Sequence, residues 1–259
     1  MDIKTDDSGR DGNYIRIRVI LLGEIASSFI LENISSNVSF YKITQKKEIQ
    51  IHEVEVYCND ADIVLLVSDL NDNFASENIC TIIDILHQKK ILYSTIISNH
   101  KVLLDCKGVS ASNELIIENH DASMMETEFS VSKKMNKIIS SLCQLIDNEI
   151  ITYRALGDDF SPLITLQSFF EDKGMLQLYV HSDYYDFEKV LEDSAILRSN
   201  VEQASKVWVK FGSREHLLKD ARDFMGILES TIDEDADMYF NSGNEVKSNE
   251  VILLLKYNE

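Results

Sequence analysis

The chain has 259 residues, of which 44% are hydrophobic, and this suits one large domain or two small ones with a packed core. Its 44 acidic and 25 basic residues give a formal net charge of −19, which opposes the phosphate backbone of nucleic acids and anionic lipid surfaces. No apolar run approaches the roughly 18 residues of a membrane span, and the N-terminus has no signal-peptide core. We therefore expect a cytoplasmic protein with neither nucleic acid nor a membrane as partner.

The first half of the chain alternates apolar strands with helical segments. Residues 1–13 are polar and are expected to form a flexible tail. From Ile79 to Leu86 the apolar residues recur at i, i+3, i+4 and i+7, which predicts a helix, and a second helix is predicted over 25–34. Strands are predicted over 14–22, 38–43, 49–57, 61–67 and 91–97. This order indicates an α/β domain over 14–130, a Rossmann-like parallel sheet with helices on both faces.

The second half begins with a long amphipathic helix. Residues 105–130 are polar and predict a loop or irregular region. Apolar residues from Met135 to Ile146 recur at helical spacing, so a central helix is expected over 131–150. A smaller α+β domain with a mixed sheet is expected over 151–259. Its strands are predicted at 177–180, 206–211, 236–240 and 250–257, and its helices at 185–191 and 215–228.

The connection that follows the strand at 61–67 has unusual chemistry. A strand, a tight connection and a helix offer free backbone N–H groups, and many α/β proteins bind phosphate there. Such a loop normally contains glycine, whereas Asp69-Leu-Asn-Asp-Asn-Phe-Ala-Ser-Glu77 contains none and carries three acidic side chains. Bulky side chains and carboxylates would crowd and repel a phosphate.

The order of elements resembles the FtsZ/tubulin family of filament-forming GTPases. The segment LEDSAILRSNVEQASKVWVKFGSREHLLKDARDF, residues 191–224, is similar to the helix, strand and helix of the FtsZ second domain. The segment DADMYFNSGNEVKSNEVILLLKY, residues 235–257, is similar to the last hairpin of the family. ADIVLLVSDLNDNFASENICTIIDIL, residues 61–86, aligns without a gap with the strand, glycine-threonine loop and helix of FtsZ. The resemblance covers nearly the whole chain.

Within this resemblance the nucleotide-binding positions are degenerate. The glycine-threonine loop of the family falls on residues 69–77, and its first glycine run falls on residues 23–28, which keep one glycine and add a carboxylate. The acidic segment that completes hydrolysis in the family falls on residues 160–165, which contain no acid, although Asp158 and Asp159 precede them. The residues that occupy nucleotide-binding positions are Gly23, Glu24, Ser27, Asp69, Asn71, Asp72, Asn73 and Ser76.

The resemblance thus implies a pseudo-GTPase, a non-catalytic FtsZ-like protein that acts by protein–protein contact in cell division or a bacterial cytoskeletal assembly. No cofactor is expected, and the partner would be an FtsZ-type subunit or the chain itself. Two alternatives stay open. The chain could be a divergent GTPase that holds GTP through the backbone N–H groups of residues 71–76, or an unrelated doubly wound module that binds a small ligand at the carboxyl ends of its strands.

Two further patterns receive simpler interpretations. Asp69, Asn71, Asn73 and Glu77 match positions of a calcium-binding loop, but Phe74 and Cys80 stand where that loop needs glycine and glutamate. We instead expect these residues to close a turn, with Ser76 or Glu77 capping the following helix. The cysteines Cys58, Cys80, Cys106 and Cys143 are widely spaced and are expected to be reduced core thiols.

Overall fold

A computed structural model describes residues 15–29, 37–45, 49–98, 105–106, 109–110, 113–117, 131–146, 162–172, 174–181, 186–211, 217–242 and 250–258. In this part of the chain one nine-stranded sheet runs through the molecule, in the order β10-β9-β11-β8-β7-β4-β3-β1-β2. Its strands are β1 (Ile17–Leu22), β2 (Val38–Ile43), β3 (Ile63–Asp69), β4 (Tyr93–Ser98), β7 (Asn113–Ile117), β8 (Met175–His181), β9 (Lys206–Phe211), β10 (Asp237–Ser242) and β11 (Val251–Tyr257). A separate ribbon pairs β5 (Asp105–Cys106) with β6 (Val109–Ser110).

The two halves of the sheet differ in strand direction. In the first half, β2, β1, β3, β4 and β7 are all parallel, as the continuous apolar strands predict. In the second half, β11 lies antiparallel between β8 and β9, and β10 is parallel to β9. The prediction of a parallel sheet followed by a mixed one is confirmed. The two sheets are also joined, because β7 pairs with β8 at Glu114–Met175 and Leu115–Leu176.

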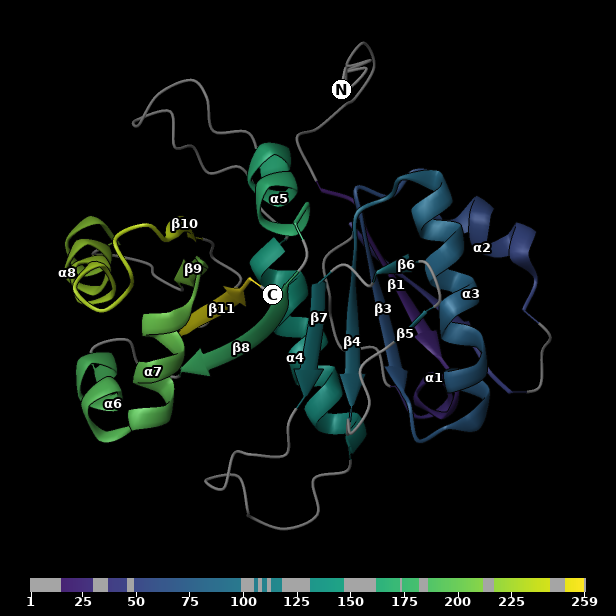
Figure 1. The fold of residues 1–259 in the computed structure, drawn as a ribbon, viewed down its shortest axis with the longest axis horizontal. Helices are drawn as coiled ribbons and strands as arrows, with labels where there is room; N and C mark the ends of the chain where they lie inside the picture. The colour runs from purple at the N-terminus through teal and green to yellow at the C-terminus, as the bar shows by residue number, and fades with distance from the viewer. Residues whose placement is uncertain are drawn as a thin grey trace.

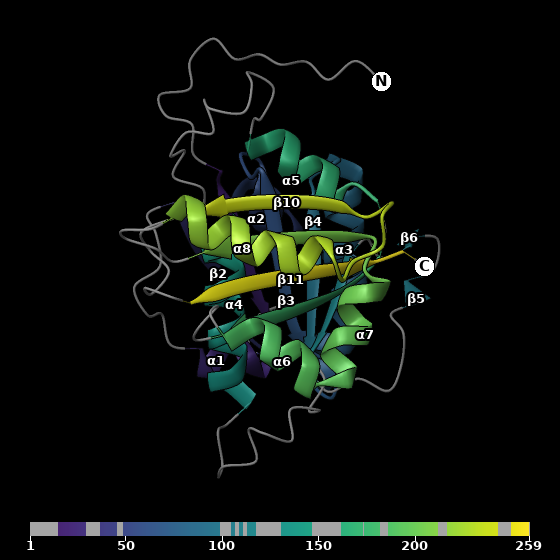
Figure 2. The same cartoon turned by 90° about the vertical axis from the view of Figure 1, so that its left-hand side faces the viewer.

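Helices cover both faces of the sheet (Figure 1). They are α1 (Glu24–Ser28), α2 (Ile51–Cys58), α3 (Asn73–Lys89), α4 (Val131–Ile146), α5 (Pro162–Phe170), α6 (Phe187–Asp193), α7 (Ala195–Gln203) and α8 (Leu217–Glu229). Figure 1 shows α4 and α5 in the middle, between the β1–β4 half and the β8–β11 half. Figure 2 shows α6, α7 and α8 in front of the mixed half of the sheet.

One core cluster spans both halves. Residues of α4 and α5, such as Leu142 and Phe169, pack in the same buried cluster as Val19 of β1 and as Trp208 and Leu254 of the mixed sheet. The central helix was predicted from its apolar stripe, and Ile139, Leu142, Leu145 and Ile146 are indeed fully buried. Trp208 is also fully buried, in a strand whose six residues are all buried.

The prediction of a strand over 49–57 is wrong. The segment forms the helix α2, which buries Val54 and Cys58 at i, i+4 and leaves Ile51 and Val56 exposed. The physical reason is topological. Both β2 and β3 run parallel to β1, so the chain must cross back between them, and parallel strands need such a crossover.

Other expectations also need correction. The irregular region at 105–130 contains β7 of the main sheet, and the helices α5 and α7 were not predicted. The helix expected over 25–34 is described only as α1, and 30–36 lie outside the described residues. The last two strands are not a paired hairpin, since β9 lies between β10 and β11. Cys58 and Cys143 are free and buried as expected, but Cys80 is disulfide-bonded, so the expectation of four reduced thiols is wrong.

Three lysines of the mixed sheet donate hydrogen bonds to the C-terminal ends of α4 and α5. Lys206 donates to Ser168 O at 2.6 Å and to Asp172 Oδ2 at 3.0 Å, and Lys210 donates to Gln144 O. Lys256 donates to Phe169 O at 2.7 Å and to Asp172 O at 2.5 Å. These bonds satisfy carbonyls at the C-terminal ends of α4 and α5, where positive charge is favourable. Burial, and after it the neighbouring Lys206, lowers the pKa of Lys256 to about 8.

No helix among the described residues is both long enough and apolar enough to span a bilayer.

Candidate functional site

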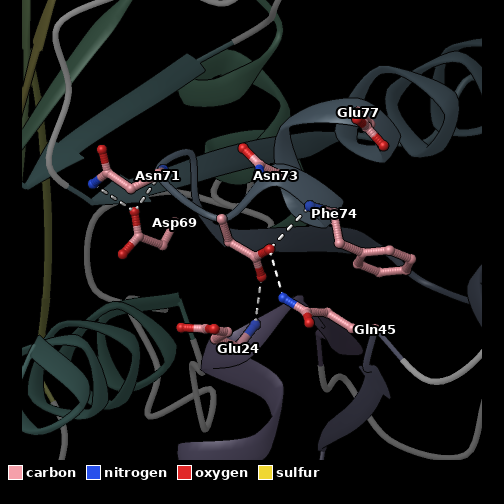
Figure 3. A pocket seen from close by; sticks show the side chains of 8 residues that line it. Glu24, Gln45, Asp69, Asn71, Asn73, Phe74 and Glu77 are labelled. Atoms are coloured by element: carbon pink, nitrogen blue, oxygen red, sulfur yellow. Dashed lines mark hydrogen bonds between the residues drawn. The ribbon is translucent and has the colours of Figure 1, made fainter.

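A cavity of about 510 Å³ lies at the carboxyl ends of the parallel strands (Figure 3). Strands β1, β2 and β3 run in the same direction, so the segments that follow them meet at one edge of the sheet. α1 follows β1 directly, Gln45 follows β2, and the loop to α3 follows β3. The lining residues are Glu24, Gln45, Asp69, Asn71, Asp72, Asn73, Phe74 and Glu77.

The loop after β3 is built by its own acidic and amide side chains. Asp69 Oδ1 accepts bonds of 3.0 Å from both the backbone N–H and the side-chain amide of Asn71, which closes the turn as predicted. Asp72 is the N-cap of α3, and its Oδ1 accepts from Phe74 N at 2.9 Å. The expectation that Ser76 or Glu77 caps the helix is therefore wrong. Ser76 lies inside the first turn and donates its hydroxyl to Asn73 O.

The turn after β1 brings the backbone close to Asp72. Gly23 has a φ of 85°, a conformation that L side chains rarely adopt. A Cβ atom at this position would overlap the Asp72 Oδ2 atom, so glycine is required for the close approach. The next N–H group, that of Glu24, donates to Asp72 Oδ2 at 2.7 Å.

The Asp72 carboxylate is thus the centre of the site. Besides Glu24 N and Phe74 N it accepts a bond of 2.8 Å from the Gln45 side-chain amide (Figure 3). The residue is only 8% exposed, so these donors replace water around the charge. Gln45 was not predicted as a site residue. Its position just after a strand parallel to β1 is the signal that could have identified it.

The charged side chains that line the cavity, among the described residues, are all acidic. Glu24, Asp69 and Glu77 add three carboxylates to that of Asp72, and no lysine, arginine or histidine belongs to the described residues that line the cavity. Among the described residues, no group of three or more His, Cys, Asp or Glu side chains is placed to hold a metal ion.

The structure brings together most of the residues at predicted nucleotide positions. Five of the eight line the cavity: Glu24, Asp69, Asn71, Asp72 and Asn73. Gly23 lies next to Asp72, whereas Ser27 and Ser76 are exposed and do not line the cavity. Of the segment 160–165, matched to the hydrolytic acids, residues 160 and 161 lie outside the described residues, as do Asp158 and Asp159 before them, and 162–165 form the first turn of α5.

No protein-family model and no curated protein sequence matches the chain significantly. Solved structures do match its fold. An empty FtsZ dimer from M. jannaschii has a TM-score of 0.72 at 12% identity, covering 93% of this chain and 88% of that one. An FtsZ point variant from M. jannaschii has a TM-score of 0.68 at 11% identity, covering 95% and 91%. GDP-form TubZ protofilaments of Bacillus thuringiensis serovar israelensis give 0.57 at 12% identity, covering 96% and 86%. The chain therefore has the two-domain fold of the FtsZ and tubulin proteins.

Proposed function

We propose that this chain is a non-catalytic protein of FtsZ-like fold that works through protein–protein contact in a cytoskeletal or cell-division assembly. Its partner would be a second copy of the chain or an FtsZ-type subunit. The observation that carries the proposal is the carboxylate lining of the cavity at the carboxyl ends of the parallel strands.

This lining opposes a nucleoside triphosphate on electrostatic grounds. Two unit charges about 6 Å apart repel by about 3 kcal/mol at an effective dielectric constant of about 20, and a triphosphate would face several such carboxylates. The backbone N–H groups of Glu24 and Phe74, in the first turns of α1 and α3, already donate to Asp72. A phosphate would meet neither free donors nor a cation at these positions, so binding and turnover of GTP are disfavoured together.

The fold supports contact with protein partners. The solved structures that share it include a dimer and protofilaments, and a fold that stacks on copies of itself presents complementary surfaces at its two ends. The net charge of −19 would repel like copies. We therefore expect short oligomers or contact with a less acidic subunit rather than long filaments, with association that strengthens as salt screens the repulsion.

Two measurements on the purified chain test this proposal. Calorimetric titration with GTP and magnesium should give no saturable binding, and a phosphate-release assay should give no turnover above the protein-free blank. Sedimentation velocity should be run at low and high salt, with and without GTP. The degree of association should increase with salt concentration and should not change when GTP is added. Micromolar GTP binding with turnover would overturn the non-catalytic assignment in favour of a divergent GTPase. A strict monomer that also fails to bind an FtsZ-type subunit would overturn the assignment of partners.

A further inference from the structure

Among the described residues, β2 is one edge of the nine-stranded sheet, and its only neighbour is β1. Asn37 O accepts from Ile17 N at 3.1 Å, so residue 37 and every second residue after it direct their backbone groups toward β1. The N–H and C=O groups of Val38, Phe40 and Lys42 therefore point away from the sheet. No backbone group in the described part of the chain pairs with them.

We propose that β2 pairs antiparallel with β2 of a second copy of the chain, about a two-fold axis at Phe40. Residues 38 and 42 then lie opposite residues 42 and 38 of the partner subunit, and the two Phe40 residues lie opposite each other. Each of these pairs exchanges two N–H···O bonds, so every outward-pointing group of β2 is satisfied. An axis at Ser39 or Tyr41 would leave one outward-pointing residue of each strand unpaired. This contact, the β2 junction, rests on the proposed function in that it gives the surface for a second copy.

Charge favours this edge of the sheet over the opposite one. Residues 38–43, VSFYKI, contain one lysine and no acid. The opposite edge, β10, begins at Asp237 and follows the exposed acids Asp233, Glu234 and Asp235. In a chain with a net charge of −19, two copies therefore repel each other less at β2 than at β10. Figure 1 shows α2, which contacts β2, at one end of the molecule and β10 at the other.

The edge of β2 also lacks the usual features that block strand addition. It contains no proline, and it pairs with β1 over six consecutive residues without a bulge. Its charged residue, Lys42, would lie opposite Val38 of the partner subunit, so the junction places no like charges directly across from each other.

One face of the junction would be aromatic. Val38 and Phe40 pack against the core cluster, and the Phe40 ring lies 5.2 Å from that of Phe29. The two-fold axis places the two Phe40 side chains directly opposite each other, and aromatic cross-strand pairs stabilise antiparallel strands. The junction thus extends an aromatic contact that each copy already contains.

The other face of the junction would bring the two α2 helices together. Tyr41 of β2 stacks on Tyr57 at 5.1 Å and donates to Glu53 at 2.6 Å, so this side of α2 lies over β2. Val56 is three residues from Glu53 and therefore lies beside it, with 62% of its surface exposed. The two-fold axis places both α2 helices on the same face of the joined sheet, where Val56 would lose part of this exposure.

The test exchanges charges across the junction. Val38→Lys places a lysine opposite Lys42 of the partner subunit in two pairs of the dimer, and like charges directly opposite each other destabilise strand pairing. Adding Lys42→Glu converts both pairs to opposite charges. Along one strand residues 38 and 42 are about 13 Å apart, so this rescue requires pairing between copies. Ile196→Lys is the matched control, because Ile196 is 77% exposed on α7 and the change adds the same charge away from β2.

Sedimentation velocity over a series of protein concentrations, at high salt to screen the net charge, gives the dissociation constant of each variant. We expect a reversible monomer–dimer equilibrium for the native chain, about tenfold weaker dimerisation for Val38→Lys, recovery to within about threefold in the double variant, and no change for Ile196→Lys. Val38→Lys has one negative charge less than the native chain and the double variant has one more. A general charge effect would therefore favour the single variant.

A native chain that stays monomeric, equal dimerisation by native and Val38→Lys chains, or no recovery in the double variant would each overturn the proposal. If Val38→Lys does not show cooperative urea unfolding, Lys42→Pro decides. It removes an N–H that points away from β1, and proline is tolerated at such edge positions. Dimerisation of Lys42→Pro equal to that of the native chain would contradict the junction.

The outcomes for the junction and for the proposed function are distinguishable. A monomeric chain that binds an FtsZ-type subunit overturns the junction alone. Turnover of GTP by a native chain whose dimer follows the charge exchange overturns the non-catalytic assignment alone.

Discussion

The contact between Gly23 and Asp72 can be measured by a double-mutant cycle. Gly23→Ala forces a side chain into a backbone conformation that costs about 1–3 kcal/mol for residues other than glycine. Its Cβ would also overlap Asp72 Oδ2, so the carboxylate must move and give up its bond to Glu24 N. A hydrogen bond to a charged group contributes about 1.5–3 kcal/mol. We expect this variant to lose about 2.5–6 kcal/mol of unfolding free energy, the sum of these two costs.

Asp72→Gly loses the bonds to Glu24 and Gln45 but little capping, since glycine at an N-cap costs only a few tenths of a kcal/mol. We expect a loss of about 3–6 kcal/mol, because two hydrogen bonds to a charged group contribute about 1.5–3 kcal/mol each. In the double variant the bond between Asp72 and Glu24 can be lost only once, and the overlap with the new Cβ no longer exists. The double variant should therefore be more stable than the sum of the single losses predicts, by about 1.5–3 kcal/mol.

The assay is urea unfolding at 25 °C followed by far-ultraviolet circular dichroism. Gly226→Ala is the matched control, because a Cβ there meets no atom within 4 Å, and alanine in the α8 helix should stabilise the chain by about 0.5–1 kcal/mol. If the losses at Gly23 and Asp72 add to within about 0.5 kcal/mol, the two residues are not in contact and the description of the site is wrong.

Three other changes test the fold. Gly174→Ala places a Cβ on the Tyr257 carbonyl oxygen and 3.0 Å from Lys256 Cε, so urea unfolding should show a loss of about 1–3 kcal/mol; an unchanged midpoint would contradict the packing of β8 on β11. Burial lowers the pKa of Lys256 from 10.5 to about 8, so between these values the unfolded chain binds more protons and stability should rise with pH, on the order of 1 kcal/mol from pH 8 to 9.5. Lys256→Met should remove that rise in urea titrations at each pH, and an identical rise in both proteins would place its origin elsewhere. Val54→Ala should cost about 2 kcal/mol and Val56→Ala less than about 0.5, because of these two valines of α2 only Val54 is buried; equal losses would favour a strand, where both side chains share a face.

Some helices and strands could be predicted from the pattern of their own residues. The run at 63–67 is continuously apolar, as expected for β3, which is buried on both faces, and the stripe from Ile79 to Leu86 marks the buried face of α3. The stripe of α4 is equally local. The prediction for 49–57 was wrong because the segment does have a period-two pattern. The need for a crossover helix there follows only from the parallel pairing of both β2 and β3 with β1.

The candidate site divides in the same way. The sequence located the loop at 69–77, its lack of glycine and its carboxylates, because these are properties of adjacent residues. It did not identify Gln45, and it assigned the helix cap to Ser76 or Glu77 instead of Asp72. The bond from Gln45 to Asp72 depends on where two neighbouring strands end, whereas the Asp72 cap is a local bond from Phe74 N that depends on where α3 begins.

By itself, the sequence determined the class of the fold, the buried strands of its first half, the central helix and the acidic character of the loop after β3. Hydrophobic periodicity and charge can be read directly from the order of residues, without knowledge of tertiary contacts. Only the tertiary structure decided that the parallel and mixed sheets join through β7 and β8, and that Asp72 holds Glu24 and Gln45. These contacts join residues far apart in the chain, and their partners are fixed by strand order and register, which no local pattern encodes.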